Sequence, residues 1–215
     1  MIYFEKKAQP ELQVKLDAAK SGNRENVYRS DVVYEQVKKD FCEKCYLCED
    51  DEMTSIQIEH FNPHQGDMDL KYTWNNLFYS CGHCNNLKGN HFWPLLDCTK
   101  KADKVWESIE IKFTAFPKAK VEVVVHPQVG AEQKCANTKA FLDKSLCGLD
   151  TTAMKKDEAE IIRKKMLRNY NQLMIGINAN DDIQIKASIA DNAAFAGAMR
   201  WVLKNEYPSI YKKVI

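Results

Sequence analysis

The chain has 215 residues, of which 45% are hydrophobic and 28% charged, and its formal net charge is +1. This composition excludes a fibrous or low-complexity chain, and it excludes a protein that binds nucleic acid through bulk charge alone. The sequence has no apolar run of membrane-spanning length and begins without the apolar segment of a signal peptide. We therefore expect a cytoplasmic protein with no membrane partner, in which clustered cysteines bind metal.

The first region, residues 1–40, is predicted to be helical. Pro10 suits a first helical turn, and the run 21–23 ends that helix. A second helix follows, with Ser30 or Asp31 as its cap. The apolar residues assigned to these two helices are Leu12, Val14, Leu16, Val32, Val33 and Val37.

Residues 41–98 hold six of the eight cysteines and four of the five histidines. Two CxxC pairs lie in this region, and two such turns brought together supply four thiolates, the set that structural zinc prefers. The predicted zinc ligands are Cys45, Cys48, Cys81 and Cys84. Gly82 is expected to supply the unusual backbone angles of the second turn. Redox chemistry remains an alternative, as does Cys42 in place of a ligand, because Cys42 and Cys45 also form a CxxC.

Residues 99–215 are predicted to form a β-hairpin followed by helices. The hairpin spans 105–126 and turns at residues 117–119; its alternating apolar residues are Ile109, Ile111, Phe113, Val121, Val123 and Val125. A buried helical stripe is expected from the spacing of Ala159, Ile162, Met166, Tyr170 and Leu173. The basic cluster within 155–168 is predicted to be a solvated helix face, with a nucleic-acid track as the alternative.

The last helix is expected to be capped by Asp191 and to stop before Pro208. Its apolar residues are Phe195, Met199, Val202 and Leu203. The remaining cysteines, Cys98, Cys135 and Cys147, have no partner at metal spacing and are expected to be buried free thiols.

A longer pattern surrounds the two cysteine pairs. Ile56 and Ile58 alternate like a short strand that would deliver an acid–histidine pair to its end. In chain order the pattern is Cys45, Cys48, Glu59-His60, Asn76, Cys81, Cys84, Asn85 and Lys88. This order resembles the HNH endonucleases with the ββα-metal fold. Their pattern is a CxxC, an acid–histidine pair at a strand end, a central asparagine, and a second CxxC followed by histidine or asparagine and a nearby lysine.

The resemblance implies an α+β protein with an HNH nuclease core over 41–98, between the helical segment 1–40 and the hairpin and helices of 99–215. It implies that neutral His60 is the general base and that Asn76 orients its ring.

By the same resemblance, Glu59 and Asn85 would hold a catalytic Mg²⁺ or Mn²⁺. Two departures bear on this ion site: Glu59 stands where aspartate is common, and Asn85 stands where histidine is frequent.

Further side chains of the region are assigned less specific roles. His64 and Lys88 are candidate contacts to nucleic acid, with solvated charges as the alternative. His91 is a weaker phosphate candidate, against surface or packing roles. His83 is expected to be an exposed ring, with a place in the zinc ligand set as the alternative.

A second, wider resemblance is to the nuclease subunits of Septu and retron-associated anti-phage systems. It rests on the residues 81–89 and 92–97, the sequence around Glu59-His60, and the segment 195–200. It implies an ABC-type ATPase partner and cleavage of DNA, with tRNA as the second substrate class. The alternatives are a non-catalytic zinc module that binds nucleic acid or protein, and a standalone restriction-type nuclease.

Overall fold

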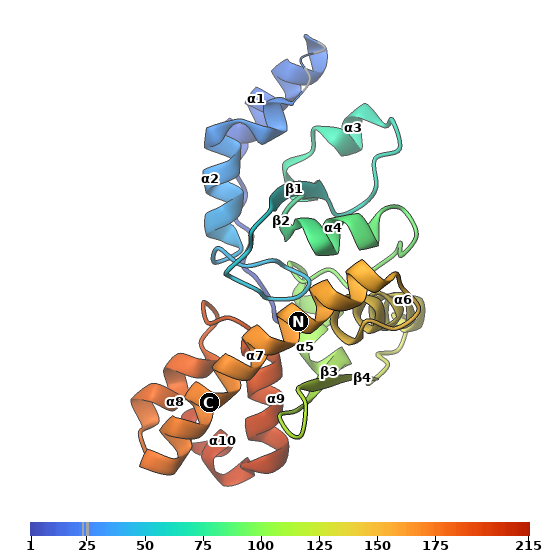
Figure 1. Cartoon of the computed structure of the whole chain (residues 1–215). Coiled ribbons are helices and arrows are strands. Elements are labelled where there is room, and N and C mark those ends of the chain that lie inside the picture. The colour runs from blue at the N-terminus through green and yellow to red at the C-terminus, as the bar shows by residue number, and fades with distance from the viewer. Residues whose placement is uncertain (23, 25) are drawn as a thin grey trace.

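The structure, a computed structural model, describes residues 1–22, 24 and 26–215. It contains two separate two-stranded antiparallel sheets, β1 (Ile56–His60) with β2 (Leu77–Cys81) and β3 (Ile109–Thr114) with β4 (Lys120–Val125). Helices surround both sheets (Figure 1). The predicted α+β class is therefore confirmed, and the hairpin expected within 105–126 is present.

The helices fall before, between and after the two sheets. The α-helices are α1 (Pro10–Ser21), α2 (Asp31–Asp40), α3 (Met68–Lys71), α4 (Gly82–Lys88), α5 (Val105–Ser108), α6 (Glu132–Leu142), α7 (Ala153–Ala179), α8 (Asp182–Ile189), α9 (Ala196–Glu206) and α10 (Pro208–Val214). Short turns of other helix types are η1 (Val27–Arg29), η2 (Trp74–Asn76), η3 (Lys101–Asp103) and η4 (Asp143–Cys147).

The two N-terminal helices form as predicted but bury a narrower face. Pro10 begins α1, and Ser30 is the N-cap residue of α2 without a side-chain capping bond. Val14 and Val32 are exposed, contrary to their assignment to the apolar face. Leu12 and Leu16 are one turn apart and buried, so the residue midway between them must face away. The predicted end at 21–23 agrees with Ser21 as the last residue of α1, and residue 23 lies outside the described residues.

The C-terminal helices correct one prediction. The expected stripe on α7 is buried, with Tyr170 half-buried. Asp191 does not cap the next helix: α9 begins after Phe195, and the Asp191 carboxylate instead accepts a bond from Arg200 at 2.6 Å. Pro208 not only ends α9 but also begins α10, because a first-turn residue needs no backbone N–H.

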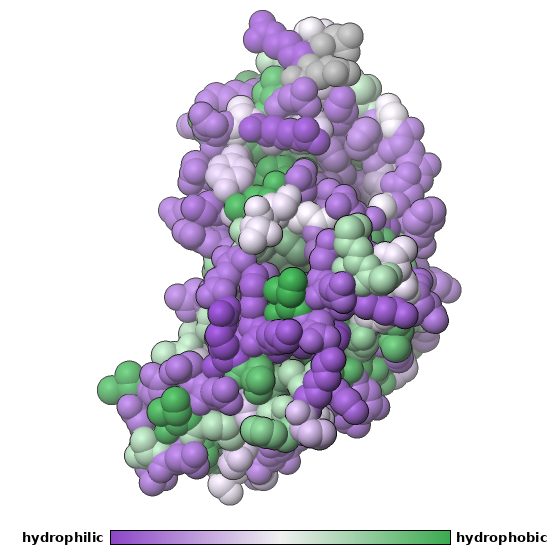
Figure 2. Space-filling model, in the orientation of Figure 1, coloured by the Kyte–Doolittle hydropathy of each residue, from purple (hydrophilic) through white to green (hydrophobic). Residues whose placement is uncertain are grey.

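One continuous hydrophobic cluster runs through all three predicted regions, with Leu16, Phe78 and Leu173 among its members. The face shown in Figure 2 is largely hydrophilic, and its apolar patches are small and separate. No helix in the described part of the chain is both long and apolar enough to cross a membrane.

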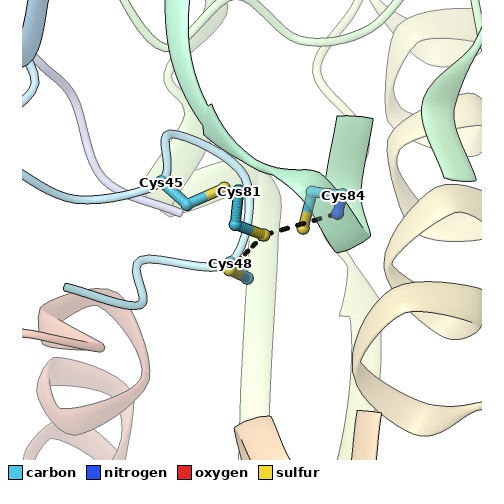
Figure 3. Close-up of side chains that lie close together, drawn as sticks. All are labelled: Cys45, Cys48, Cys81 and Cys84. Carbon is cyan, nitrogen blue, oxygen red and sulfur yellow. Dashed lines mark hydrogen bonds between the residues drawn. The ribbon is translucent and has the colours of Figure 1, made fainter. Parts of the chain in front are cut away.

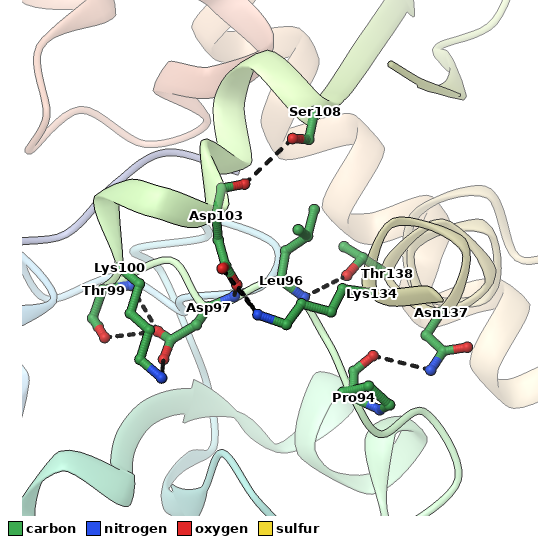
Figure 4. A network of polar contacts seen from close by, with 10 residues as sticks. All are labelled: Pro94, Leu96, Asp97, Thr99, Lys100, Asp103, Ser108, Lys134, Asn137 and Thr138. Carbon is green, nitrogen blue, oxygen red and sulfur yellow. Dashed lines mark hydrogen bonds and ion pairs between the residues drawn. The ribbon is translucent and has the colours of Figure 1, made fainter. Parts of the chain in front are cut away.

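A polar network fixes the chain after β2 to α6 (Figure 4). The Asp103 carboxylate accepts from the Asp97 backbone N–H at 2.7 Å and pairs with Lys134 of α6 at 2.9 Å. Two further bonds join this part of the chain to α6: the Leu96 N–H donates to Thr138 Oγ1, and Asn137 Nδ2 donates to the Pro94 carbonyl. These bonds place α6 against the core that follows the second cysteine pair.

The basic cluster on α7 is divided: Lys156, Lys164 and Arg168 are exposed, as predicted for a solvated face, whereas Lys155, Arg163 and Lys165 are half-buried. Lys165 binds the Asp50 carboxylate at 2.6 Å, and Arg168 pairs with Glu52. Both acidic residues belong to the loop that follows the first cysteine pair. α7 therefore docks directly on the region that carries the candidate site.

Candidate metal centre and active site

The four predicted zinc ligands converge in the structure (Figure 3). Cys45 and Cys48 lie in the loop after α2, Cys81 ends β2, and Cys84 lies in the first turn of α4. All four are buried, and their sulfur atoms lie within 4.8 Å of one another. Among the described residues, this is the group of histidine, cysteine and acidic side chains that converges closely enough to hold an ion.

The sulfur spacing fits tetrahedral zinc. The Sγ atoms of Cys48 and Cys81 lie 3.9 Å apart. Zn–S bonds of about 2.3 Å give a tetrahedral edge of about 3.8 Å, whereas a disulfide requires about 2.05 Å. Hydrogen bonding to Cys45 and Cys81 raises the pKa of Cys48, and burial raises the pKa of Cys84. Hydrogen bonds from the other three cysteines instead lower the pKa of Cys81. A bound cation would favour the thiolate forms of Cys48 and Cys84, and the cluster can hold a zinc ion.

The other cysteines stay outside this cluster. Cys42 is half-buried at a left-handed backbone position with φ 52°, and Cys45 takes the ligand position. Cys98 and Cys135 are buried free thiols as predicted, and Cys147 is a half-buried one.

Gly82 is required for a reason that differs from the predicted one. Its φ does not lie in the left-handed region. A Cβ atom at this position would lie 2.8 Å from Ser55 Oγ, and the Gly82 N–H donates to the Ser55 carbonyl at 2.9 Å. The glycine thus allows the chain before β1 to approach the second cysteine turn.

Five of the predicted site residues line one open cleft of about 400 Å³ beside the four-cysteine cluster: Glu59, His60, His64, Asn85 and Lys88. β1 supplies the first two, the following loop supplies His64, and α4 supplies Asn85 and Lys88. The β1–β2 pairing sets this arrangement, since His60 lies opposite Leu77 at the end of the hairpin and α4 packs on both strands.

His60 is bonded through one ring nitrogen, and the other ring nitrogen has no hydrogen-bond partner within residues 1–22, 24 and 26–215. Its Nε2 lies 3.0 Å from the Lys71 carbonyl oxygen, which can only accept, so Nε2 carries the hydrogen. Burial lowers the pKa of His60 to about 4. At neutral pH the ring is therefore uncharged, and Nδ1 keeps a lone pair that can take a proton from water.

The His64 ring lies next to the His60 ring, and it is bonded through Nδ1 whereas His60 is bonded through Nε2. The two ring centroids are 4.7 Å apart in an edge-on arrangement. His64 Nδ1 accepts a bond from the Gly66 N–H at 3.2 Å, so in the neutral ring the hydrogen is on Nε2. The cleft thus offers one imidazole that accepts a proton and one that donates a hydrogen bond.

Asn76 does not bond to the His60 ring, in contrast to the predicted role. Its Oδ1 accepts from the Asn62 N–H at 2.7 Å, and its Nδ2 donates to the carbonyls of Asn62 and Leu70 at 2.9 Å each. Both amide hydrogens are used on the loop between β1 and β2. That loop carries Lys71, whose carbonyl accepts a hydrogen bond from His60 Nε2. Asn76 therefore affects the position of the His60 ring indirectly, by holding the loop backbone.

Asn76→Ala is expected to lower the free energy of unfolding by about 2–4 kcal/mol, because three partly buried backbone groups of the loop lose their partner. The measurement is urea denaturation of the full chain. Asn86→Ala, on the exposed side of α4, is the matched control and should change stability by less than about 0.5 kcal/mol. Equal stabilities for the two variants would contradict the loop-holding role.

Glu59 and Lys88 form a buried pair, which corrects two predictions. Lys88 Nζ lies 2.9 Å from Glu59 Oε2 and 3.0 Å from the His60 carbonyl, and the Tyr46 hydroxyl donates to Glu59 Oε1. Lys88 is 2% exposed, so it is not a free surface contact for phosphate. Burial raises the pKa of Glu59 against the opposing effects of Lys88 and Tyr46.

The predicted Mg²⁺ or Mn²⁺ site is not formed by these contacts. Both carboxylate oxygens of Glu59 already have partners, and Asn85 alone offers a neutral amide oxygen. The four cysteines can hold zinc, whereas Glu59 is bonded to Lys88 and Tyr46 and would have to give up one of these contacts to a hard divalent ion in the cleft.

Two other histidines lie away from this cleft. His83 is not an exposed ring: its Nδ1 lies 2.5 Å from the Glu158 carboxylate of α7 and its Nε2 lies 2.9 Å from the Ser145 carbonyl. It joins the second cysteine turn to the C-terminal region. His91 is exposed and does not line the cleft.

Sequence reasoning missed Tyr28, Arg29 and Tyr46. Tyr28 and Arg29 come from η1 and line the cleft, although they precede the first cysteine pair. No motif marks them, since their role depends on how the N-terminal segment folds back. Tyr46 lies inside the first CxxC. Its side chain is fully buried, and this burial follows from the tertiary fold and not from a sequence pattern.

No protein-family model matches the chain. A stretch of 51 residues is 41% identical to the Septu protein PtuB of Bacillus thuringiensis. This chain is similar in part to a Septu protein. The match covers 22% of this chain and 20% of the relative, so the chain spans about a fifth of that protein's length.

Proposed function

We propose that the chain is an HNH-type endonuclease that hydrolyses phosphodiester bonds in DNA as part of an anti-phage defence system. The observation that carries the proposal is His60, a neutral imidazole that faces an open cleft beside a four-cysteine cluster. The partial similarity to a Septu protein supports the defence role. By the resemblance of the motif, the hairpin β1–β2 followed by α4 would be the ββα-metal core.

The proposed chemistry begins at His60 Nδ1. This nitrogen takes a proton from a water molecule, and the water oxygen attacks phosphorus while the P–O3′ bond breaks. The proton remains on His60 until it returns to solvent, and the leaving oxygen is protonated from water. We assign to the His64 Nε2–H a hydrogen bond to a phosphoryl oxygen, since its Nδ1 is already bonded to the Gly66 N–H. Zinc, when bound to the four cysteines, holds β2 and α4 against the first cysteine turn.

The family resemblance also implies a Mg²⁺ or Mn²⁺ ion held by Glu59 and Asn85. Since Lys88 and Tyr46 occupy Glu59, such a site would require these contacts to open. The same pairing favours the second candidate function, a zinc module that binds nucleic acid without cutting it.

A cleavage assay on the purified full chain tests the proposal. Supercoiled plasmid and total RNA are incubated with Mg²⁺, with Mn²⁺ and with no added divalent ion, each with and without the candidate ABC-type ATPase partner. Plasmid cleavage that strengthens with the ATPase supports a DNA-cutting defence complex. Equal cleavage without the ATPase supports a standalone nuclease, RNA cleavage alone changes the substrate, and retention of DNA without cleavage supports the zinc module.

The pH profile of cleavage should reflect the lowered pKa of His60. With a pKa of about 4, the ring stays neutral at pH 5.5, whereas an ordinary histidine would be about nine-tenths protonated there. The rate at pH 5.5 is therefore expected to stay within about twofold of the rate at pH 7, and to fall as pH approaches 4.

Initial rates measured from pH 4 to 8 under constant ionic strength give this profile. The same series on His64→Ala separates the two imidazoles, because only His64 is then absent. A rate that falls about tenfold between pH 7 and 5.5 in both proteins would contradict the assignment of His60 as the buried, neutral base.

A further inference from the structure

The cleft has a wall that does not come from the predicted nuclease region. η1, between α1 and α2, places Tyr28 and Arg29 in the lining beside His60. The Tyr28 ring is buried and meets the His60 ring edge-on, with centroids 4.9 Å apart. The N-terminal segment therefore contacts the proposed base directly.

Arg29 is exposed and is oriented by the same tyrosine. Its guanidinium carbon lies 5.3 Å from the centre of the Tyr28 ring, a distance at which a cation and an aromatic face attract each other. Arg168 pairs with Glu52 and Arg200 with Asp191, whereas no carboxylate in residues 1–22, 24 and 26–215 forms an ion pair with Arg29.

The other strong base in the lining cannot serve the same purpose. Lys88 is buried and bonded to Glu59 and to the His60 carbonyl. Among the described residues that line this cleft, Arg29 thus supplies the exposed positive charge. A guanidinium remains charged at every working pH and can give two parallel hydrogen bonds to phosphate.

We propose that Arg29, held against Tyr28, binds a phosphate of the DNA backbone and so positions the neighbouring phosphodiester at His60. This inference rests on the proposed function and adds a substrate-binding residue from outside the motif region. It also accounts for backbone binding by a chain with a net charge of +1, because one oriented arginine acts locally.

The test measures DNA binding separately from cleavage. A fluorescently labelled DNA duplex is titrated, without added divalent ion, against full-length chains that carry His60→Ala to block cutting. Adding Arg29→Ala should weaken binding about tenfold or more and reduce the slope of log affinity against log salt by about one. Adding Arg29→Lys should restore part of the affinity and the full salt slope, since the charge is retained.

Arg168→Ala is the matched control, because Arg168 is exposed on α7 and already pairs with Glu52. It should leave affinity and salt slope unchanged, and thermal unfolding of all variants shows that they fold. Equal binding by the Arg29→Ala and Arg168→Ala chains overturns the inference, as does the absence of DNA binding by the parent chain. If the wild-type chain binds DNA through Arg29 but never cuts it, the proposed function fails and the inference stands.

Discussion

Replacing Cys81 with serine is expected to remove zinc from the protein and to unfold the region around the candidate site. Cys81 joins β2 to α4, and its sulfur lies 3.9 Å from that of Cys48. Structural zinc contributes about 10–16 kcal/mol in zinc-finger peptides, which exceeds the whole stability of many domains. Elemental analysis should show loss of the ion, and thermal unfolding should show loss of the cooperative transition.

Two serine variants control for the loss of a thiol. Cys147→Ser keeps a donor for the Val121 carbonyl, and Cys42→Ser tests the alternative ligand three residues before Cys45. Both should keep the zinc and most of the stability. Loss of zinc from Cys42→Ser with retention in Cys81→Ser would mean that the ligand set is wrong.

Replacing His60 with alanine is expected to lower the rate of DNA cleavage by about 10²–10⁴-fold while zinc stays bound. The substitution removes the only atom of this side chain assigned to proton transfer, Nδ1, and leaves the four cysteines untouched. Plasmid cleavage under single-turnover conditions measures the rate, and elemental analysis measures the zinc.

His91→Ala is the control for this experiment, since His91 is exposed and lies outside the cleft lining. Its cleavage rate should match the wild type. A His60→Ala chain that cuts DNA at the wild-type rate would remove His60 as the base, and with it the observation on which the proposed function rests.

The parts of the fold that follow local patterns could be predicted from the sequence. Alternation of apolar and polar residues between 109 and 125 predicted the second hairpin, and the helical spacing of apolar residues predicted the buried stripe on α7. The four cysteines were predictable because metal ligands come as paired turns. These features depend on neighbours within a few residues of each other or on one repeated chemical unit.

The contacts that the sequence did not reveal are long-range. The sequence predicts Lys88 as a phosphate contact and Glu59 as a metal ligand. The packing of α4 on β1 instead brings the two side chains together as a buried ion pair. Asn76 was assigned to the ring of His60, yet its amide is used on the backbone of the intervening loop. Which of several polar partners a side chain takes depends on the tertiary fold, and a motif does not record it.

α7 connects two distant parts of the molecule as a single rod. It has 27 residues and is therefore about 40 Å long. Near one end Glu158 binds His83 of the second cysteine turn, and further along Lys165 binds Asp50 beside the first; the other end packs on α8 (Figure 1). Because one helix contacts both cysteine turns and α8, the C-terminal helices and the four-cysteine cluster are joined through a single continuous element.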